Sequence, residues 1–363
     1  MGVKFELTCG KCYIFNLLKS MKQIEHCRSD TPRSKSCVLF PGALGDFICF
    51  LPALQMLARD TEVHLFARSE FADIVPSGVT VRTIECHEIS RLFIADAAED
   101  QRLQKFFGSY EVIYSWLGSQ QREYVQRLES FSGGGAQVFP LRPNNSETHQ
   151  TDYYLSCLPR GRIVSRQPVI RPRPEGMAWC ARFRATHQLH GRPVLAIAPG
   201  SGAVEKNWPA AFFLAVVEWW REAFDGVAVL LAGPVEKERG GIERLRRDCL
   251  VASDLTLSQA VGLLDGCELY LGNDSGMTHL AAAAGIRTVA LFGPSNLRQW
   301  APRGQRVTVL SRNIDCSPCQ SAKMKSCPHR ACLTELYPTD IINLMATLPE
   351  VVTLTRMGAG IKV

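Results

Sequence analysis

The fold is decided by residues 265–295, which read DGCELYLGNDSGMTHLAAAAGIRTVALFGPS. Two short apolar runs in this stretch flank an alanine-rich segment that is typical of a helix. A strand, a helix and a second strand in this order indicate a βαβ unit, which predicts a parallel sheet. Ligands of such sheets bind at the carboxyl ends of strands, where the next helix begins. The turn N-D-S-G at 273–276 is therefore predicted to lie at such a position.

Two interpretations of this turn are open from its residues alone. Small residues let the backbone approach a ligand closely, and free N–H groups at a helix start can hold a phosphate. Alternatively, Asp274 or Ser275 only caps the helix, and the alanines at 281–284 provide tight helix packing. The stretch by itself does not decide between a cap and a phosphate site.

The same residues resemble a family signature. The order N-D-S-G-M-T-H-L-A-A-A-A-G followed by V-A-L-F-G-P-S is similar to the donor-site motif of the heptosyltransferases of glycosyltransferase family 9, which use ADP-heptose. The resemblance implies the α/β GT-B fold, in which two Rossmann-like domains with parallel sheets face each other across a cleft. It also implies donor binding by Asp274, Ser275, Gly276, Met277 and His279.

Length and composition bound the class of protein. The 363 residues are enough for two domains with sizeable cores, and 46% hydrophobic with 21% charged residues is typical of a soluble globular protein. The net charge of +6 favours an acidic substrate or an anionic membrane surface. Dense basic runs are missing from the sequence, so we expect no nucleic-acid partner.

The sequence predicts a cytoplasmic protein. The most apolar window, at 38–58, contains Gly42, Asp46 and Pro52, and a charge near the centre of a membrane helix is costly, so it favours a strand, a turn and a helix. We expect no signal peptide. Fourteen cysteines without a secretion signal favour reduced thiols. A lipid-linked acceptor would add peripheral contact with the inner face of the cytoplasmic membrane.

Residues 1–35 do not fit the α/β pattern and are predicted to be an N-terminal extension. Their Cys9 and Cys12 form a C-x-x-C pair that is compatible with redox or metal chemistry, but the absence of a surrounding βαβ unit favours ordinary thiols. The first core strand is expected at Ser36–Phe40. The glycine-rich loop after it is neither a dinucleotide nor a Walker motif.

That loop and the helix after it resemble the N-terminal signature of the same family. The motif L-G-D ends at Asp46 and is followed by L-P-A-L at 51–54. The resemblance implies that Asp46 is the catalytic base and that Gly45 belongs to the donor site. A carboxylate at a loop-to-helix junction suits removal of a hydroxyl proton. The alternative is an aspartate that only stabilises the helix through its dipole.

An alternating α/β series continues through the first half. Further strands are expected at Glu62–Phe66, Val79–Ile84, Glu111–Trp116 and Gln137–Leu141. A helical segment at Thr151–Leu158 precedes an Arg- and Pro-rich stretch that contains the domain boundary. We expect an acceptor domain at 36–166 and a nucleotide-sugar donor domain at 167–363.

The second half repeats the opening pattern. A strand at Val194–Ala198 is followed by P-G-S-G-x-x-x-K-x-W-P, a segment that also resembles the family. The resemblance implies donor phosphate contacts by Ser201 and Lys206, and a lysine there can neutralise the leaving diphosphate in catalysis. The alternative is a solvated surface lysine. After a strand at Val227–Ala232, the resemblance implies a ribose-binding glutamate, for which Glu236 is preferred over Glu238.

A cysteine-rich loop is expected at 313–338, where periodicity is weak. Its thiols follow the pattern C-x2-C-x7-C-x4-C, which is not that of a standard zinc module. Four thiolates can hold zinc or iron tetrahedrally. Some heptosyltransferases that modify proteins bind iron in this way, and the alternative is four free or buried thiols. The predicted ligands of a structural metal are Cys316, Cys319, Cys327 and Cys332.

Together, the four separated motifs imply an inverting glycosyltransferase. It would transfer a heptose from an ADP-sugar to a hydroxyl of a lipopolysaccharide core or another acidic glycan. No cofactor is expected in catalysis, because Lys206 and helix termini can neutralise the phosphates. The alternatives are another nucleotide-sugar transferase or epimerase on the same fold, and a binding module without catalysis.

Overall fold

The computed structural model describes residues 34–94, 100–159, 165–233 and 241–359. Residues 35–363 form one compact unit that contains both sheets. We call residues 34–159 the N-terminal half and residues 165–359 the C-terminal half. Cys9, Cys12 and almost all of the predicted extension lie outside the described residues.

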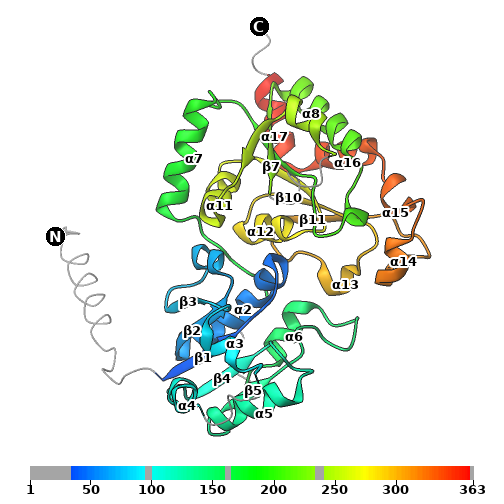
Figure 1. The fold of residues 1–363 in the computed structure, drawn as a ribbon. Coiled ribbons are helices and arrows are strands. Elements are labelled where there is room, and N and C mark those ends of the chain that lie inside the picture. Colours follow the sequence, from blue (N-terminus) through cyan, green and yellow to red (C-terminus); the bar gives the residue numbers. More distant parts are fainter. Residues whose placement is uncertain (1–33, 95–99, 160–164, 234–240, 360–363) are drawn as a thin grey trace, which may run out of the picture. The chain divides into compact units, whose positions relative to one another are not determined.

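The N-terminal half contains a five-stranded parallel sheet in the order β3-β2-β1-β4-β5 (Figure 1). Its strands are β1 (Lys35–Leu39), β2 (Glu62–Ala67), β3 (Val79–Thr83), β4 (Val112–Ser115) and β5 (Ala136–Val138). The helical segments are α2 (Leu44–Asp60), η1 (Ser69–Asp73), α3 (His87–Arg91), α4 (Gln101–Phe107), α5 (Arg122–Phe131) and α6 (Gln150–Ser156). The central strand β1 leads directly into α2, so the residues between them lie at the carboxyl edge of the sheet.

Helix α2 is almost entirely buried because both of its long faces have partners. It packs against α6 of its own half and against α12 of the other half. Phe40, Phe50, Trp116 and Tyr154 form an aromatic cluster beneath it, in which Phe40 and Phe50 stack at 4.5 Å between ring centroids. This burial explains why the apolar window at 38–58 is a core strand and a core helix.

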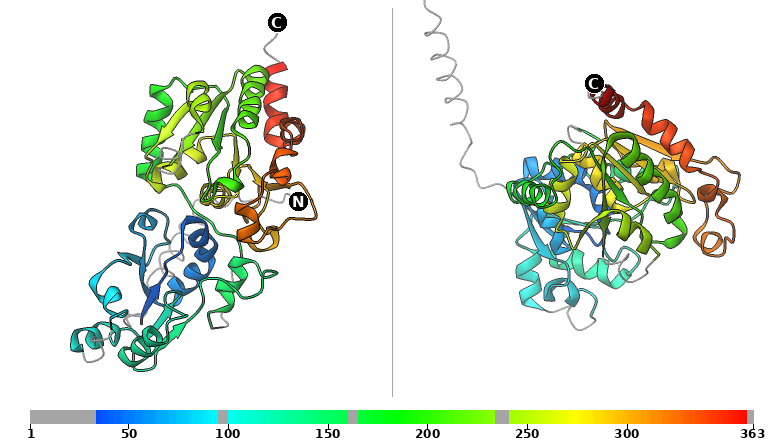
Figure 2. Two further views of the ribbon diagram at one scale, coloured as in Figure 1. Left: turned by 45° about the vertical axis from the view of Figure 1, so that its right-hand side comes forward. Right: turned by 90° about the horizontal axis from the view of Figure 1, so that it is seen from above.

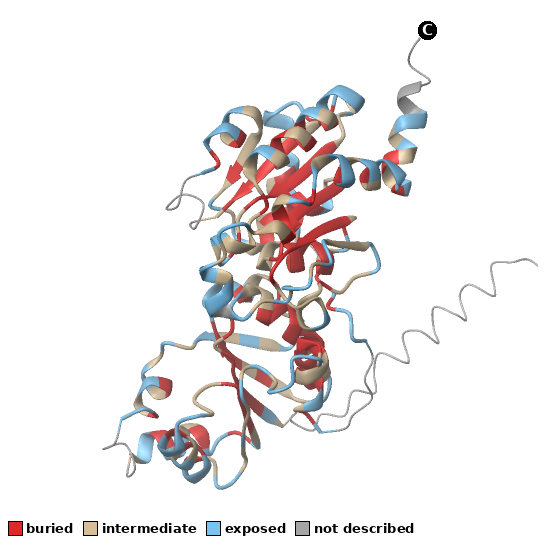
Figure 3. Cartoon of the chain, turned by 90° about the vertical axis from the view of Figure 1, so that its right-hand side faces the viewer, coloured by how far each residue is buried: buried red, intermediate tan, exposed pale blue. Residues whose placement is uncertain are grey.

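The C-terminal half contains a six-stranded parallel sheet in the order β11-β10-β9-β6-β7-β8. Its strands are β6 (Val194–Ala198), β7 (Val227–Ala232), β8 (Leu250–Ser253), β9 (Leu269–Asn273), β10 (Thr288–Phe292) and β11 (Val307–Ser311). Buried residues, red in Figure 3, concentrate in the strands of both sheets. Continuous burial of the central strands is expected when helices cover both faces of a parallel sheet.

The helical segments of this half surround its sheet. They are α7 (Pro174–Thr186), η3 (Val204–Lys206), α8 (Ala210–Phe224), α10 (Glu243–Asp248), α11 (Leu257–Asp265), α12 (Gly276–Ala284), α13 (Leu297–Trp300), α14 (Ser321–Lys325), α15 (Ala331–Thr334), α16 (Pro338–Thr347) and α17 (Pro349–Ala359). The last two, orange to red in Figure 2, pack beside α8. In the part of the chain that the structure describes, no helix is both long and apolar enough to span a bilayer.

The structure confirms the predicted pair of parallel sheets and the βαβ unit at 265–295, which is β9, α12 and β10. The predicted strands differ from the observed ones by a few residues at their ends. Strand β8 was not predicted, because only four residues pair at the sheet edge and they are largely half-buried. The apolar run of this strand, Leu250 to Ala252, is shorter than those of β6 and β7.

Candidate functional site

Asp46 lies in the first turn of α2, where its side chain is buried. Its Oδ2 accepts a hydrogen bond from the backbone N–H of Ala43 at 3.2 Å. Its buried Oδ1 has no hydrogen-bond partner among the described residues, and the nearest cation is Nη2 of Arg142 at 3.8 Å. Burial raises the pKa of Asp46 above the usual value, and Arg142, the Ala43 N–H and Lys206 oppose this rise. Asp46 is thus a carboxylate with one unused acceptor atom.

The N-terminus of α12 lies directly against that of α2. A Cβ at Gly276 would lie 2.9 Å from Cβ of Leu44 and 3.1 Å from the backbone nitrogen of Gly45. Only glycine therefore fits at position 276 without moving one of the helices. The contact brings the predicted base on α2 beside the predicted donor-site helix α12.

The loop after β6 meets the end of β9 through one ion pair. Lys206 Nζ donates to Asp274 Oδ2 at 2.8 Å, and the Asp274 side chain is buried. Ser201, from the same loop, donates to the carbonyl of Ala203 and to Oδ1 of Asn207. The structure therefore brings Lys206 and Asp274 together, whereas these two hydrogen bonds of Ser201 lie within its own loop.

Asn273 is a residue that the sequence analysis missed. It is fully buried, its Nδ2 donates to the carbonyl of Pro199 at 2.6 Å, and its Oδ1 accepts from the N–H of Trp208 at 3.0 Å. Both ends of the loop that carries Lys206 are thereby fixed to β9. A buried amide that bonds backbone on both sides is a strong constraint on loop geometry.

The start of α12 combines the two interpretations of its turn. Ser275 is the N-cap, and its hydroxyl accepts from the N–H of Thr278. The N–H groups of Gly276 and Met277, in the first turn, have no intrahelical partner by geometry. The cap is therefore observed, and it leaves N–H groups that can hold an anion.

His279 is buried between the two helices. Its Nδ1 lies 3.8 Å from Sγ of Cys49 on α2. Burial lowers the pKa of His279 to about 4, so the imidazole is neutral near pH 7. Glu236 and Glu238, the predicted ribose ligands, lie outside the described residues.

The two halves are joined by contacts between residues 142–152 and residues 296–303, which we call the seam. The sequence analysis did not predict these contacts. Each contact links segments about 150 residues apart, so no local pattern signals it. The contacts are Arg142 with the Trp300 ring, Glu147 with Arg298, Ser146 with Asn296, His149 with the Ala301 carbonyl, and Asp152 with Arg303.

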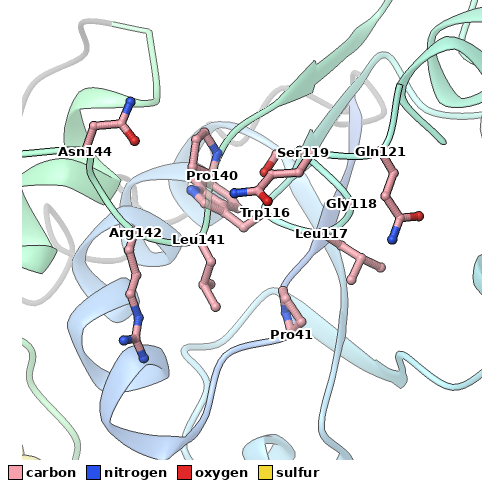
Figure 4. Close-up of a pocket in the computed structure, with 11 residues that line it drawn as sticks. Pro41, Trp116, Leu117, Gly118, Ser119, Gln121, Pro140, Leu141, Arg142 and Asn144 are labelled. Carbon is pink, nitrogen blue, oxygen red and sulfur yellow. The ribbon is translucent and has the colours of Figure 1, made fainter. Parts of the chain in front are cut away.

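A cavity of about 490 Å³ opens in the N-terminal half (Figure 4). Its walls come from the segments that follow β1, β4 and β5. The lining residues are Pro41, Trp116, Leu117, Gly118, Ser119, Gln120, Gln121, Pro140, Leu141, Arg142 and Asn144. Arg142, which contacts Asp46, is also a wall of this cavity.

The four predicted metal ligands line one small cavity of about 20 Å³. Burial and the other three thiols raise the pKa of Cys332 to about 11, whereas backbone N–H groups lower that of Cys327. Within the described ranges, no group of three or more His, Cys, Asp or Glu side chains is arranged closely enough to hold an ion. The structure thus gathers the thiols around a common space, and a bound metal stays a prediction.

The fold and the motif residues define a class, the glycosyltransferases of GT-B fold. The profile of glycosyltransferase family 9 (heptosyltransferase) matches residues 146–328, and the chain belongs to this family. Lipooligosaccharide heptosyltransferase 2 of Campylobacter jejuni is 28% identical over 166 residues, which are 42% of this chain and 50% of that protein. The chain therefore spans about half the length of the relatives that it matches in sequence.

Solved structures resemble the chain over a longer range. A family 9 glycosyl transferase from Veillonella parvula superposes with a TM-score of 0.69 at 17% identity, covering 90% of this chain and 99% of that one. The heptosyltransferase WaaC of E. coli with ADP superposes with a TM-score of 0.57 at 16% identity, covering 86% and 98%. These likenesses confirm the predicted GT-B fold.

Proposed function

We propose that the chain is an inverting glycosyltransferase that moves a heptose from ADP-heptose to a hydroxyl of a lipopolysaccharide core or a related acidic glycan. The observation that carries the proposal is the contact of Gly276 with Leu44 and Gly45. It puts a buried carboxylate with an unused oxygen next to a helix start and a lysine. A base and an anion site in such proximity suit transfer of a sugar from a diphosphate.

In the proposed mechanism, Lys206 and the start of α12 hold the diphosphate of the donor. The Lys206 ammonium gives up its ion pair with Asp274 and pairs with the phosphates instead. The N–H groups of Gly276 and Met277 donate to the phosphate oxygens. Both stabilise the charge that develops on the departing ADP, so they act most strongly in the transition state. Asp274, His279, Ser201 and a glutamate after β7 would orient the rest of the donor.

Asp46 takes the proton in the same step. The acceptor oxygen forms a bond to the anomeric carbon, the bond from that carbon to the phosphate oxygen breaks, and the hydroxyl proton moves to Oδ1 of Asp46. ADP leaves with the electron pair. Burial strengthens Asp46 as a base because it raises the pKa of the carboxyl. No residue in this scheme requires a metal or another cofactor.

The first experiment is a thermal-shift screen of the full chain with ADP, UDP, GDP, CMP and NAD. A ligand at about 100 times its Kd adds roughly 2.7 kcal/mol of apparent stability, which is easily measured. We expect stabilisation by ADP alone, followed by ADP release from ADP-heptose when a core glycan is added. Stabilisation by UDP or GDP alone would overturn the donor. Tight ADP binding without turnover of any ADP-sugar would favour the binding module.

We also propose that Cys316, Cys319, Cys327 and Cys332 hold a structural zinc or iron ion. The support is the shared cavity, whose volume is close to that of one water molecule, and the soft donor set of four thiols. Metal analysis should give about one equivalent in protein purified with and without air. A content below one equivalent in every preparation would refute the site. Replacement of Cys332 by Ser should release the ion. Cys86→Ser is the matched control, because Cys86 lies outside the cysteine loop and does not line the cavity.

Peripheral contact with the inner face of the cytoplasmic membrane is a further proposal. A net charge of +6 favours an anionic surface, and a lipid-linked acceptor would be presented there. Sedimentation with vesicles should show binding that increases with the fraction of anionic lipid and decreases with salt. Equal recovery with neutral and anionic vesicles would contradict the proposal.

A further inference from the structure

The cavity of the N-terminal half is placed like a substrate site. Strands β1, β4 and β5 are neighbours in the sheet, and the cavity is lined by the segments at their carboxyl ends. Ligands of open parallel sheets bind at this edge. The volume of about 490 Å³ falls in the usual range for small-molecule sites.

The lining suits a sugar. Pro41, Pro140 and Leu141 give the lining apolar surface, and the side chains of Ser119 and Gln121 carry hydrogen-bonding groups (Figure 4). Apolar faces combined with a few amides and hydroxyls match the alternating C–H and O–H groups of a saccharide. Among the described residues that line the cavity, Arg142 is the charged one.

Arg142 is held only weakly where it lies. Its side chain is 61% exposed, its Nη2 is 3.8 Å from Oδ1 of Asp46, and its guanidinium lies 5.0 Å from the centre of the Trp300 ring. At 3.8 Å the two atoms are beyond hydrogen-bond distance, so no direct hydrogen bond fixes the guanidinium to Asp46. A carboxylate or phosphate in the cavity offers two parallel hydrogen bonds, which is the stronger interaction.

We infer that Arg142 binds an acidic group of the acceptor sugar in this cavity and, in doing so, uncovers Asp46 for the acceptor hydroxyl. The inference rests on the proposed transferase function and adds the acceptor subsite and its specificity residue. Arg142 then has two alternative partners. Without acceptor it neutralises the base, and with an acidic acceptor it anchors the sugar whose hydroxyl Asp46 deprotonates.

This arrangement couples acceptor recognition to the strength of the base. The Arg142 cation is the largest influence that lowers the pKa of Asp46, while burial raises it. When the guanidinium pairs with an anion, its effect on Asp46 weakens and the carboxylate becomes more basic. A neutral sugar in the cavity leaves the Arg142–Asp46 ion pair in place. Such a sugar is therefore bound less tightly, and its hydroxyl is deprotonated less readily.

The test measures binding of simple probes by saturation-transfer NMR, without any donor. Glucuronate and glucose 6-phosphate are compared with glucose, using wild type, R142Q, R142K and the control R68Q. Arg68 is a fair match because it is 54% exposed and pairs with Glu70 at 3.7 Å. We expect wild type and R68Q to prefer at least one acidic probe by about ten- to a hundredfold, as for a charged hydrogen-bonded pair.

R142Q should lose this preference and keep its weak affinity for glucose, and R142K should keep part of it. Whichever acidic probe wild type prefers identifies the group as a carboxylate or a phosphate. The inference is overturned if wild type treats all three probes alike, or if R142Q keeps the preference.

Failure of the inference is separable from failure of the proposed function. If ADP-heptose is turned over and the probes are not distinguished, only the role of Arg142 is overturned. If the probes are distinguished through Arg142 and no ADP-sugar is turned over, an acidic-sugar site stands without the transferase. With an active transferase, R142Q should raise KM for an acidic acceptor much more than it lowers kcat, whereas a purely structural role would lower stability in R142Q.

Discussion

Lys206 and Asp274 form an ion pair at 2.8 Å that ties the loop after β6 to the end of β9. The two residues belong to different motifs of the sequence, separated by almost 70 positions. In the proposed mechanism the ammonium exchanges this carboxylate for the donor diphosphate. The pair therefore keeps the cation oriented before the donor binds.

Replacement of Lys206 by Met should lower kcat about 10²- to 10³-fold, since a preorganised charge at the leaving group is lost. It should also lower the free energy of unfolding by about 1–3 kcal/mol, because the buried Asp274 loses its partner. Steady-state kinetics and denaturant unfolding measure the two effects. Lys206→Arg keeps the charge and is the control for stability. Unchanged kcat in Lys206→Met would remove the lysine from the mechanism.

Replacement of Asp46 by Asn should abolish sugar transfer and leave ADP binding intact. The amide oxygen can still accept from the Ala43 N–H, so the start of α2 is preserved, but the side chain no longer takes a proton. The measurement pairs an assay of ADP release with the ADP-dependent thermal shift. Transfer at the rate of wild type would show that another group is the base.

The pH dependence of kcat/KM should have an acid limb above the usual aspartate range. Asp46 must be ionised to act, and burial raises the pKa of its carboxyl from 3.8. Activity is therefore lost as the pH falls through this raised value. Arg142→Gln should move the limb further up, because the main influence opposing the rise is removed. A limb that moves down in Arg142→Gln would contradict the assignment of the base.

Replacement of Gly276 by Ala should lower both stability and donor affinity. The added methyl would lie 2.9 Å from Cβ of Leu44, so α12 or α2 must shift. Overpacking of this kind typically costs about 1–3 kcal/mol. Gly202→Ala is the control, since no atom lies within 4 Å of a Cβ there. Equal midpoints of denaturation for the two variants would mean that the helices tolerate separation.

The stability of the fold should decrease in acid partly through His279. Its pKa is about 4 in the folded chain against 6.5 for an exposed histidine. The unfolded chain therefore binds the proton first, and stability present above pH 6.5 is lost as the pH falls toward 4, by at most about 1.4 kcal/mol per pH unit. His279→Gln should have a flatter profile of melting temperature between these values. If the melting-temperature profiles of wild type and His279→Gln are parallel, protonation of His279 does not destabilise the folded chain.

Much of the fold could be predicted because its signals are local. Apolar strand runs alternate with helical segments, and the turn at 273–276 lies at the end of a strand in both the prediction and the structure. The family was also predictable, since its motifs are short runs in a fixed order. Strand β8 was missed because only four residues form it at the sheet edge, which is too short a run to stand out.

The candidate site could be predicted only in part. Asp46, Lys206 and His279 belong to motifs, so their positions follow from the sequence, and their roles stay predictions. Arg142 belongs to no motif. Its guanidinium lies near Asp46 and over the ring of Trp300, which is more than 150 residues later in the chain, and these contacts are visible only in the structure.

The sequence by itself determined most of the strands and helices and which family the chain belongs to, because hydrophobic periodicity and short motifs act over a few neighbouring residues. Only the tertiary structure decided that Gly276 contacts Gly45 and that Asn273 fixes the loop that carries Lys206. It also decided that the Arg142 guanidinium lies near Asp46 and at the same time lines a cavity. These relationships depend on how two sheets and their helices pack. Packing is set by the shapes of many distant side chains together, so no short run of residues carries it.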